Sequence, residues 1–317
     1  MIDHRSRPLR AGPSNAGRPV IFGEVLFDQF ADGSCVLGGA PLNVAWHLRG
    51  FGLNPLFISR VGDDALGEQM LAVMMTWGMD ISGIQADTAR PTGTVQVALK
   101  NGQPTFYIVP DQAYDFIDAG AAIAAIAGTP LSMLYHGTLG ARQTVSRGAL
   151  DALRRQTNMP RFVDINLRPP WSTMELATNA LYNAERVKVN DDEIKQIASY
   201  ERLPGANPHE LAAVLRRHFR IGMLIVTCGE QGAFIDTAQG IDAGKPVKVK
   251  RLVDTVGAGD AFCAVSILGL TGGWPIATIL ARALAFASAI CSVRGATTTN
   301  QGLYASYIEQ WERDGGR

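Results

Sequence analysis

Short apolar runs alternate with helical segments along most of this chain, and that alternation limits the folds open to it. The apolar runs, each followed by polar residues or glycine, lie at residues 19–23, 56–59, 133–136, 161–164, 186–190 and 223–227. Segments in which apolar residues recur at helical spacing lie at residues 66–77, 145–155, 174–183 and 209–219. This order predicts a mostly parallel central sheet with helices on both faces. Ligands of such sheets bind beyond the carboxyl ends of the strands, so the polar residues after each run are candidate site residues.

Two segments break the alternation and predict a second, smaller sheet. Thr94–Lys100 and Thr105–Val109 flank Asn101-Gly102, which is typical of a β-hairpin, and a further turn lies earlier in the chain. The predicted small antiparallel sheet comprises residues 29–37 and 92–109, and the α/β core comprises residues 19–28, 38–91 and 110–317. A small sheet beside a ligand cleft often serves as a lid. The alternative is a simple extension of the main sheet at its edge.

Charge and cysteine usage exclude some classes of protein. The chain has 29 Lys and Arg against 29 Asp and Glu, and this zero net charge argues against nucleic acid as a partner. Four cysteines are scattered without a C-x-x-C motif, so neither a disulfide framework nor a zinc site is expected. We predict reduced, mostly buried thiols in a cytosolic protein.

The chain start and the most apolar segment argue against a secreted or membrane protein. Residues 1–18 hold four arginines but no apolar stretch, which predicts a disordered arm rather than a secretory signal, with a transit peptide as the alternative. Residues 276–293 are apolar but include Arg282, which favours a buried helix over a membrane span. A cytoplasmic location without a membrane partner is the resulting prediction.

The segment Asp254-Thr-Val-Gly-Ala-Gly-Asp-Ala-Phe262 is the strongest local signal. It follows a predicted strand at residues 247–253 and precedes a predicted helix at residues 261–270. Two glycines at a helix start let backbone N–H groups and the helix dipole approach an anion, which predicts a phosphate cradle. The dinucleotide motif G-x-G-x-x-G fails at Phe262, and no Walker A loop is present. Asp260 is either a helix cap or the base of a phosphoryl transfer.

A second glycine-rich segment, Gly38-Gly-Ala-Pro-Leu-Asn43, also precedes a predicted helix. A glycine pair allows the backbone to approach a small ligand, and the Asn43 amide offers both donors and an acceptor. By itself this segment is a weak signal, and an ordinary glycine-rich turn is the simpler interpretation.

Together, the two segments resemble the two sequence signatures of the ribokinase-like (PfkB) carbohydrate kinase family, in the family's order. Further segments similar to family motifs are Gly23-Glu24 with Asp28, Val61–Gly67, Asn190–Glu193 and Val226–Gly232. The resemblance implies a three-layer α/β/α domain with a small antiparallel β-lid, and transfer of phosphate from ATP to a sugar.

Within that family, the first signature and the run Asp164-Ile-Asn-Leu-Arg-Pro-Pro-Trp171 are most similar to bacterial fructokinases. Residues 297–299 are threonines where fructokinases commonly have a proline-containing stretch. The resemblance therefore implies a fructokinase-like enzyme, with a kinase of another furanose, a keto-sugar acid or a nucleoside as alternatives. A catalytically silent sugar-binding regulatory protein is a remoter alternative.

The resemblance and the local chemistry together assign catalytic roles. Asp260 would accept the hydroxyl proton, and the N–H groups of Gly257, Ala258 and Gly259 would hold the developing charge. Arg168 is a candidate phosphate clamp, because a guanidinium pairs with phosphate in a fork; the alternative is a surface arginine held by the two prolines after it.

The remaining predicted roles concern binding. Sugar contacts are expected from Asp28, Gly38, Gly39 and Asn43, and from the lid residues Gln96 and Tyr107. Nucleotide contacts are expected from Asn190, Thr227, Gly229 and Gly232. Glu193 would reach Mg²⁺ through water, and Asp254 with the region of Gly295 resembles a monovalent-cation (K⁺) loop. Family members often dimerise through the lid, which implies a homodimer.

Overall fold

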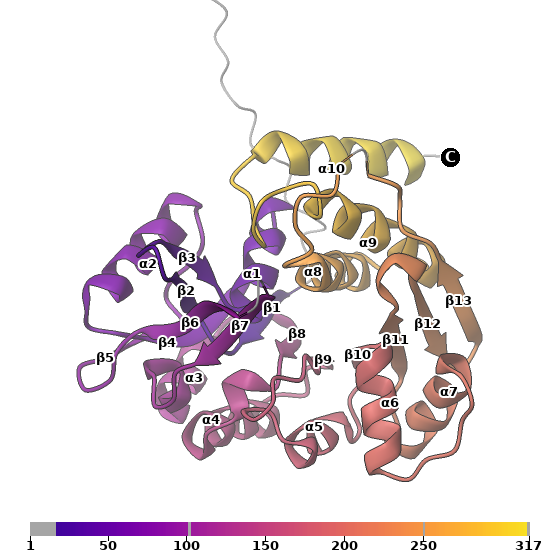
Figure 1. Ribbon diagram of the computed structural model, residues 1–317, viewed down its shortest axis with the longest axis horizontal. Coiled ribbons are helices and arrows are strands. Elements are labelled where there is room, and N and C mark those ends of the chain that lie inside the picture. The colour runs from indigo at the N-terminus through magenta and orange to yellow at the C-terminus, as the bar shows by residue number, and fades with distance from the viewer. Residues whose placement is uncertain (1–16, 101–102, 250, 316–317) are drawn as a thin grey trace, which may run out of the picture.

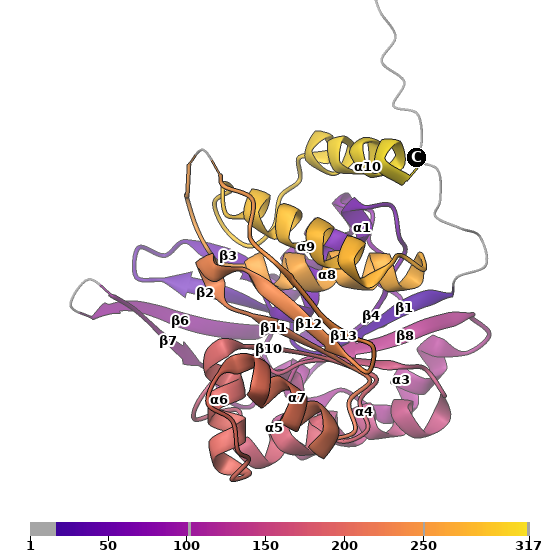
Figure 2. The ribbon, with the colours of Figure 1, turned by 90° about the vertical axis from the view of Figure 1, so that its right-hand side faces the viewer.

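The computed structural model describes residues 17–100, 103–249 and 251–315, which form three layers (Figures 1 and 2). The middle layer is a nine-stranded sheet in the order β13-β12-β11-β10-β9-β8-β1-β4-β5. Its strands are β1 (Arg18–Phe22), β4 (Leu56–Gly62), β5 (Ile84–Asp87), β8 (Leu131–His136), β9 (Arg161–Asp164), β10 (Arg186–Asn190), β11 (Met223–Thr227), β12 (Ala233–Thr237) and β13 (Gly240–Gly244). Every pairing from β5 to β11 is parallel, as predicted.

Helices cover both faces of this sheet (Figure 2). One face carries α1 (Ala40–Gly50), α2 (Ala65–Thr76), α8 (Ala258–Thr271), α9 (Ile276–Ile290) and α10 (Gln301–Gly315). The other face carries α3 (Ala119–Ile126), α4 (Thr144–Gln156), α5 (Met174–Leu181), α6 (Asp191–Tyr200) and α7 (Pro208–His218). Strand residues alternate between the two layers: Ile21 packs in the core under α1 and α8, whereas Val20 and Phe22 pack against α3 and α4. Burying one such side chain stabilises the fold by about 1.5–3 kcal/mol.

The far edge of the sheet differs from the prediction. The strand expected at residues 247–253 is wrong, because the described residues there pair with no strand, and Val247, Leu252 and Val253 are largely exposed. An antiparallel hairpin, β12 with β13, closes this edge instead. The apolar residues at 247–253 therefore mark an exposed connection that leads to α8.

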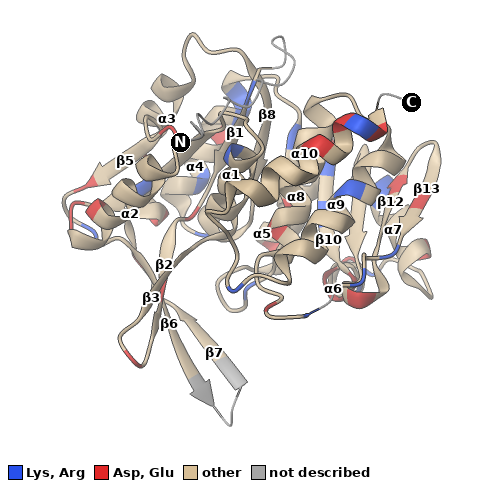
Figure 3. Ribbon diagram, turned by 90° about the horizontal axis from the view of Figure 1, so that it is seen from above, with Lys and Arg blue, Asp and Glu red and all other residues tan. Residues whose placement is uncertain are grey.

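The small sheet has the order β3-β2-β6-β7 and projects from the body (Figure 3). It consists of β2 (Leu26–Phe30), β3 (Cys35–Gly38), β6 (Gly93–Lys100) and β7 (Gln103–Ile108). The predicted hairpin of β6 with β7 is antiparallel, and so is the pair β2 with β3 on either side of the predicted earlier turn. The central pairing of β2 with β6 differs from the predicted antiparallel arrangement: it is parallel, because the chain passes through the main sheet between them. The predicted Asn101-Gly102 turn lies outside the described residues.

An aromatic cluster anchors α10 to the body. Tyr304 and Trp311 of α10 pack against Phe51 and Phe286. The Tyr304 hydroxyl lies 2.9 Å from Nδ1 of the buried His47, whose Nε2 lies 3.0 Å from the carbonyl oxygen of Ala296. Burial lowers the pKa of His47 to about 4, so this imidazole is neutral at pH 7. The cluster therefore fixes the loop around Ala296, which precedes α10.

The predictions for the cysteines, the N-terminal arm and the most apolar segment have different outcomes. All four cysteines are free, but only Cys263 is fully buried and Cys35 is exposed, so the prediction of mostly buried thiols is wrong. The predicted arm lies outside the described residues up to residue 16, whereas Arg18 already belongs to β1 and pairs with Asp80. Within the described ranges, no helix combines the length and apolar character needed to cross a bilayer.

Alanine substitutions at two helical glycines in different environments test this packing. A Cβ at Gly50, the last residue of α1, would overlap the Tyr304 ring, whereas a Cβ at Gly148 inside α4 would meet open space. Gly50→Ala should lower the free energy of unfolding by about 1–3 kcal/mol through overpacking. Gly148→Ala should raise it by about 0.5–1 kcal/mol. Urea denaturation of both variants checks the pair, and equal effects would contradict the described packing of α10.

Candidate active site

The candidate site lies along the edge where the parallel strands end. Glu24 follows β1, Thr138 follows β8, and Asp164 ends β9. Asn190 and Thr227 end β10 and β11 and are direct register partners. Since these five strands are neighbours in the order β1-β8-β9-β10-β11, their polar ends form one continuous row.

A hydrogen bond joins the two glycine-rich segments above this row. Asn43 Nδ2 donates to Asp260 Oδ2 at 2.8 Å, although the two residues are 217 positions apart. Asn43 lies in the first turn of α1, where Pro41 is the second residue and its missing N–H has no helical partner to lose. The Asn43 Oδ1 atom is buried and has no partner among the described residues. The two predicted signatures thus meet, and one polar acceptor there is free for a ligand.

Asp260 has the protonation behaviour of a base. Desolvation raises its pKa to about 7, and the charge of Asp164 adds to this effect. The hydrogen bond from Asn43 and the positive charges of Lys188 and Arg168 act in the opposite direction. A carboxylate whose pKa lies near neutral pH is suited to accept a proton and release it again.

The start of α8 is built for an anion. Its N-cap is Gly257, with φ 78° and without a side-chain cap, and a Cβ there would lie 2.5 Å from the Cα of Ala296. Within the described part of the chain, the N–H groups of Gly257 and Gly259 have no acceptor, whereas the Ala258 N–H donates to Thr255 at 3.3 Å. In the described structure the Asp260 carboxylate accepts its hydrogen bond from Asn43 and not from the helix backbone. This geometry favours the role of a base over that of a helix cap.

A buried ion pair beneath this helix start was not predicted from the sequence. Lys188 of β10 places its Nζ 2.8 Å from Asp164 Oδ1, and both side chains are almost fully buried. A Cβ on Gly259 would lie 3.2 Å from this Nζ, so the ammonium group sits directly under the first turn of α8. Burial lowers the pKa of Lys188, but the attraction of Asp164 outweighs it and holds the pKa above its usual range. The sequence feature that could have indicated this ion pair is a lysine within the otherwise apolar run 186–190.

The predicted sugar residues partly come together. Gly39 is the N-cap of α1 with φ 111°, and a Cβ there would lie 2.7 Å from the carbonyl oxygen of Glu24. A Cβ on Gly38 would lie 3.3 Å from Asp28 Oδ2. Burial raises the pKa of Asp28 to about 6. Asp28, Gly38 and Gly39 therefore line one wall near Glu24.

The structure does not bring Gln96 and Tyr107 to this wall. Gln96 pairs with Gln29 and with Tyr107, whereas Asp28 pairs with Val95. Side chains alternate between the faces of a strand, so Gln96 and Tyr107 share the face opposite to Asp28. Both side chains are exposed, and the Tyr107 ring contacts Trp171 edge-on at 6.0 Å between centroids.

The predicted nucleotide and metal residues lie at the neighbouring strand ends. Asn190 caps α6 by accepting from the N–H groups of Asp192 and Glu193. The buried Glu193 carboxylate accepts from the N–H groups of Asn190 and Leu167, both at 2.8 Å. Glu193 thereby ties the loop that carries Arg168 to the start of α6. Across the described ranges, no group of three or more His, Cys, Asp or Glu side chains could hold a metal ion.

Three further predicted glycine and acidic positions have defined geometry. Gly229 and Gly232, beyond β11, adopt φ values of 54° and 104°, which favour glycine. Asp254 accepts from the N–H groups of Val256 at 3.0 Å and Gly295 at 3.1 Å, and so joins the loop before α8 to the loop after α9.

Arg168 and Glu24 complete the row. Arg168 is exposed at its end of the loop, and its charge lowers the pKa of both Asp260 and Glu24. Glu24 is 3% exposed, and burial, aided by the charge of Asp260, raises its pKa to about 7. The sequence placed Glu24 only in a family motif and gave it no role.

Comparison with known proteins now identifies the family. The family model described as pfkB family carbohydrate kinase matches residues 21–302. The chain belongs to this family. The kinase is 31% identical over 249 residues to a fructokinase of Escherichia coli, in a match that covers 74% of this chain and 76% of the other. It is therefore a carbohydrate kinase.

Solved structures confirm the fold of this kinase. A fructokinase from Xylella fastidiosa with bound ATP has a TM-score of 0.81 at 19% identity, in a match that covers 93% of this chain and 99% of the other. A fructokinase double mutant from Vibrio cholerae O395, with fructose, ADP and a potassium ion, has a TM-score of 0.76 at 23% identity, with coverage of 92% and 98%. The predicted three-layer, ribokinase-like architecture with its small sheet is confirmed.

The Asn43–Asp260 bond predicts the pH dependence of the kinase. Only the ionised Asp260 accepts a proton, so kcat/KM should fall as the pH drops below about 7. Asn43→Ala removes a hydrogen bond that stabilises the ionised form, so the acidic limb should move to higher pH by about one unit. Steady-state pH profiles check this shift, with Asn54→Ala as the exposed control. A limb that stays in place in Asn43→Ala would contradict the prediction.

Proposed function

We propose that this carbohydrate kinase transfers the γ-phosphoryl group of ATP to a hydroxyl of fructose. The observation that carries the proposal is the hydrogen bond between Asn43 and Asp260, because it holds a carboxylate of raised pKa beside the free N–H groups of α8. Phosphoryl transfer to an alcohol needs a base for the hydroxyl proton and positive dipoles for the phosphoryl oxygens. The 31% identity to a fructokinase supports fructose as the acceptor.

In this reaction Asp260 takes the proton of the attacking hydroxyl while the hydroxyl oxygen bonds to the γ-phosphorus and ADP leaves. The unpaired N–H groups of Gly257 and Gly259 stabilise the charge on the transferring phosphoryl group, with the helix dipole behind them. Ala258 contributes less, because its N–H already donates to Thr255. Arg168 acts as the clamp on the phosphoryl oxygens, since its charge reaches Asp260.

Sugar and nucleotide occupy adjacent stretches of the row. Asp28, Gly38, Gly39 and Asn43 bind the sugar hydroxyls at the end near β1, where the Oδ1 atom of Asn43 is a free acceptor. The nucleotide binds at the ends of β10 and β11, with contacts to Asn190, Thr227, Gly229 and Gly232. The site between them excludes water when the small sheet closes as a lid.

Two carboxylates of the site are proposed to interact with cations: Glu193 with the Mg²⁺ that accompanies ATP, and Asp254 with K⁺. Mg²⁺ is usually held by one or two carboxylates together with substrate phosphates, which fits a row that offers Glu193 and no larger acidic cluster in its described part. That ion would neutralise charge on the ATP phosphates. Both Glu193 oxygens already accept backbone N–H groups, which fits a contact through water. Asp254, between two loops, is the proposed K⁺ residue, and the potassium ion in the Vibrio cholerae fructokinase supports that proposal.

We also propose a cytoplasmic homodimer that forms through the lid. The face of the small sheet that carries Asp28 exposes Phe30, Val36 and Phe106, by 39%, 45% and 59%. An exposed apolar group of this kind on a projecting sheet favours contact with a second copy. The free thiols of all four cysteines fit a reducing compartment.

Replacement of the base tests the proposed reaction directly. Asp260→Asn keeps the size of the side chain but cannot accept the hydroxyl proton, so kcat should fall about 10²- to 10⁴-fold while ATP and sugar still bind. Coupled assays of ADP formation measure turnover, and calorimetric titration measures binding. Asp151→Asn, on the exposed side of α4, is the matched control. A variant that keeps most of its turnover would show that the base lies elsewhere.

A screen of acceptors tests the proposed sugar. Wild-type enzyme with ATP should give its highest kcat/KM on fructose, ahead of ribose, other furanoses, 2-keto-sugar acids and nucleosides. A higher value on any of these acceptors would replace fructose in the proposal.

The lid surface predicts the oligomeric state. Phe106→Asp places a charge in the apolar face, and burying that charge without a partner is costly, so the dimer should dissociate. Thr105→Asp puts the same charge on the opposite face of β7 and should leave the dimer intact. Light scattering coupled to size-exclusion chromatography measures the mass, and a monomeric wild type would contradict the proposal.

A further inference from the structure

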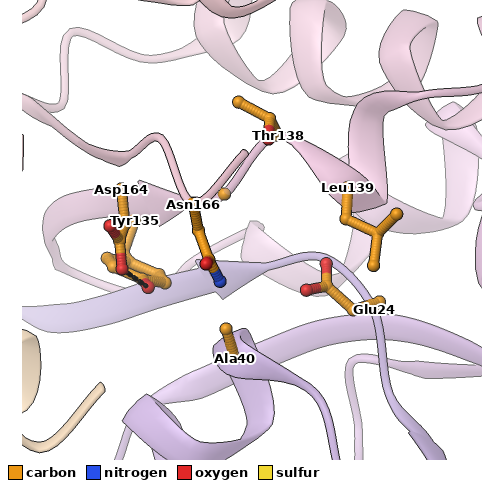
Figure 4. A pocket seen from close by; sticks show the side chains of 8 residues that line it. Glu24, Ala40, Tyr135, Thr138, Leu139, Asp164 and Asn166 are labelled. Carbon is orange, nitrogen blue, oxygen red and sulfur yellow. Dashed lines mark hydrogen bonds between the residues drawn. The ribbon is translucent and has the colours of Figure 1, made fainter. Parts of the chain in front are cut away.

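A narrow polar pocket, closed to a water molecule in this conformation, lies between the ends of β1, β8 and β9 and the start of α1 (Figure 4). The side chains of Glu24, Thr138, Asp164 and Asn166 contribute to its walls, together with Ala40 and the backbone at Gly137. It sits at the carboxyl edge of three neighbouring strands, which is where ligands of such sheets bind. None of the roles proposed above uses Glu24 or Asn166.

Glu24 has an unsatisfied oxygen in this pocket. Its side chain is 3% exposed, and Oε2 has no hydrogen-bond partner of standard geometry in the described structure, although the backbone N–H groups of Glu24 and Gly140 lie close enough to lower the pKa of the carboxyl group. Leaving such an oxygen unpaired costs about 1–3 kcal/mol, so a buried orphan acceptor calls for an explanation. A Cβ at Gly140 would lie 2.6 Å from the Cα of Gly23 and 3.1 Å from Oε2, so the glycine lets this loop pack closely against Gly23 and Glu24.

Asn166 faces Glu24 across the pocket. Figure 4 shows the Asn166 amide and the Glu24 carboxyl group pointing into the space above Ala40. Asn166 adopts φ 43°, a left-handed conformation that costs free energy for a residue other than glycine. The residue is partly exposed, and its side-chain amide, which can both donate and accept, has no hydrogen-bond partner among the described residues.

The pocket adjoins the wall assigned to the sugar. Ala40, which lines the pocket, directly follows Gly39, and Gly39 packs against the backbone of Glu24. The charges of Asp260 and Arg168 both act on the Glu24 carboxyl group, so the pocket also lies within reach of the reacting groups. A sugar held at Gly39 with one hydroxyl at Asp260 therefore extends toward Glu24 and Asn166.

We propose that Glu24 and Asn166 together bind one non-reacting hydroxyl of the sugar and so determine which sugars the kinase accepts. This inference rests on the proposed function, since it names a specificity pair within the same sugar site. The Asn166 amide donates a hydrogen bond to the hydroxyl oxygen, and the hydroxyl group donates a hydrogen bond to Oε2 of Glu24 and keeps its proton. A sugar that lacks this hydroxyl leaves the buried Glu24 oxygen unpaired, which is costly and therefore discriminates against that sugar.

Monodeoxy analogues of fructose, each lacking one hydroxyl, test the proposal with the full-length enzyme and ATP. For wild type, one analogue with an intact reacting hydroxyl should show a kcat/KM about tenfold to a hundredfold below that of fructose. Glu24→Ala and Asn166→Ala should lose a similar factor on fructose, mainly through KM. On that one analogue, both variants should nearly match wild type, because the partner of the deleted side chain is already missing. Glu24→Gln keeps a polar group of the same shape and should lie between wild type and Glu24→Ala.

The control is Asp236→Asn, which alters a buried carboxylate on β12 away from the pocket and should leave the ranking of the analogues unchanged. If Glu24→Ala fails to fold, the kcat/KM values of Glu24→Gln and Asn166→Ala on fructose and on the analogues are compared instead. Equal losses on fructose and on every analogue would overturn the proposal, because they indicate a purely structural role. A wild type that phosphorylates no sugar at all would instead overturn the proposed function, so the two failures are distinguishable.

Discussion

Parallel pairing from β5 to β11 makes each of these strands end at the same edge of the sheet, and the chemistry of this kinase depends on that constraint. A parallel connection needs a long crossover, so helices bury both faces and leave that one edge open. The helices that return above it, α1 and α8, begin there and direct their free N–H groups at the row of polar strand ends. A protein with zero net charge can therefore hold phosphate without a basic surface.

The sequence predicted the parts of this arrangement that depend on local pattern. The strands at 161–164, 186–190 and 223–227 are correct to the residue, because apolar runs between polar residues suit strands buried on both faces. The run 247–253 has a similar composition but is exposed, and composition alone does not distinguish a buried run from a connection at the sheet edge. The positions of Gln96 and Tyr107 could not be predicted for a similar reason. The face of the small sheet to which their side chains point depends on the register of β6 with β2, which the sequence alone does not give.

Contacts between elements that are distant in the chain could not be predicted from the sequence. Lys188 could have pointed to solvent from an edge strand, and only its place between β9 and β11 explains why it is buried against Asp164. Glu193 was recognised as part of a motif, but its bond to the Leu167 N–H, which positions the Arg168 loop, requires two neighbouring strands. Glu24 appeared as one more acidic residue after a strand. Its unpaired oxygen becomes visible only when the surrounding walls are known.

The anchoring of α10 has a consequence for how the enzyme is made. The Ala296 loop closes against Gly257, and the imidazole of His47, which bonds to the Tyr304 hydroxyl, holds that loop in place. Synthesis runs from the N-terminus, and Tyr304 is among the last described residues to leave the ribosome. A nascent chain that stops before α10 contains the sheet and the base, but it lacks the Tyr304 contact that holds the Ala296 loop against the phosphate cradle. Catalytic competence therefore depends on α10, which is translated after every strand of the described sheet and after Asp260.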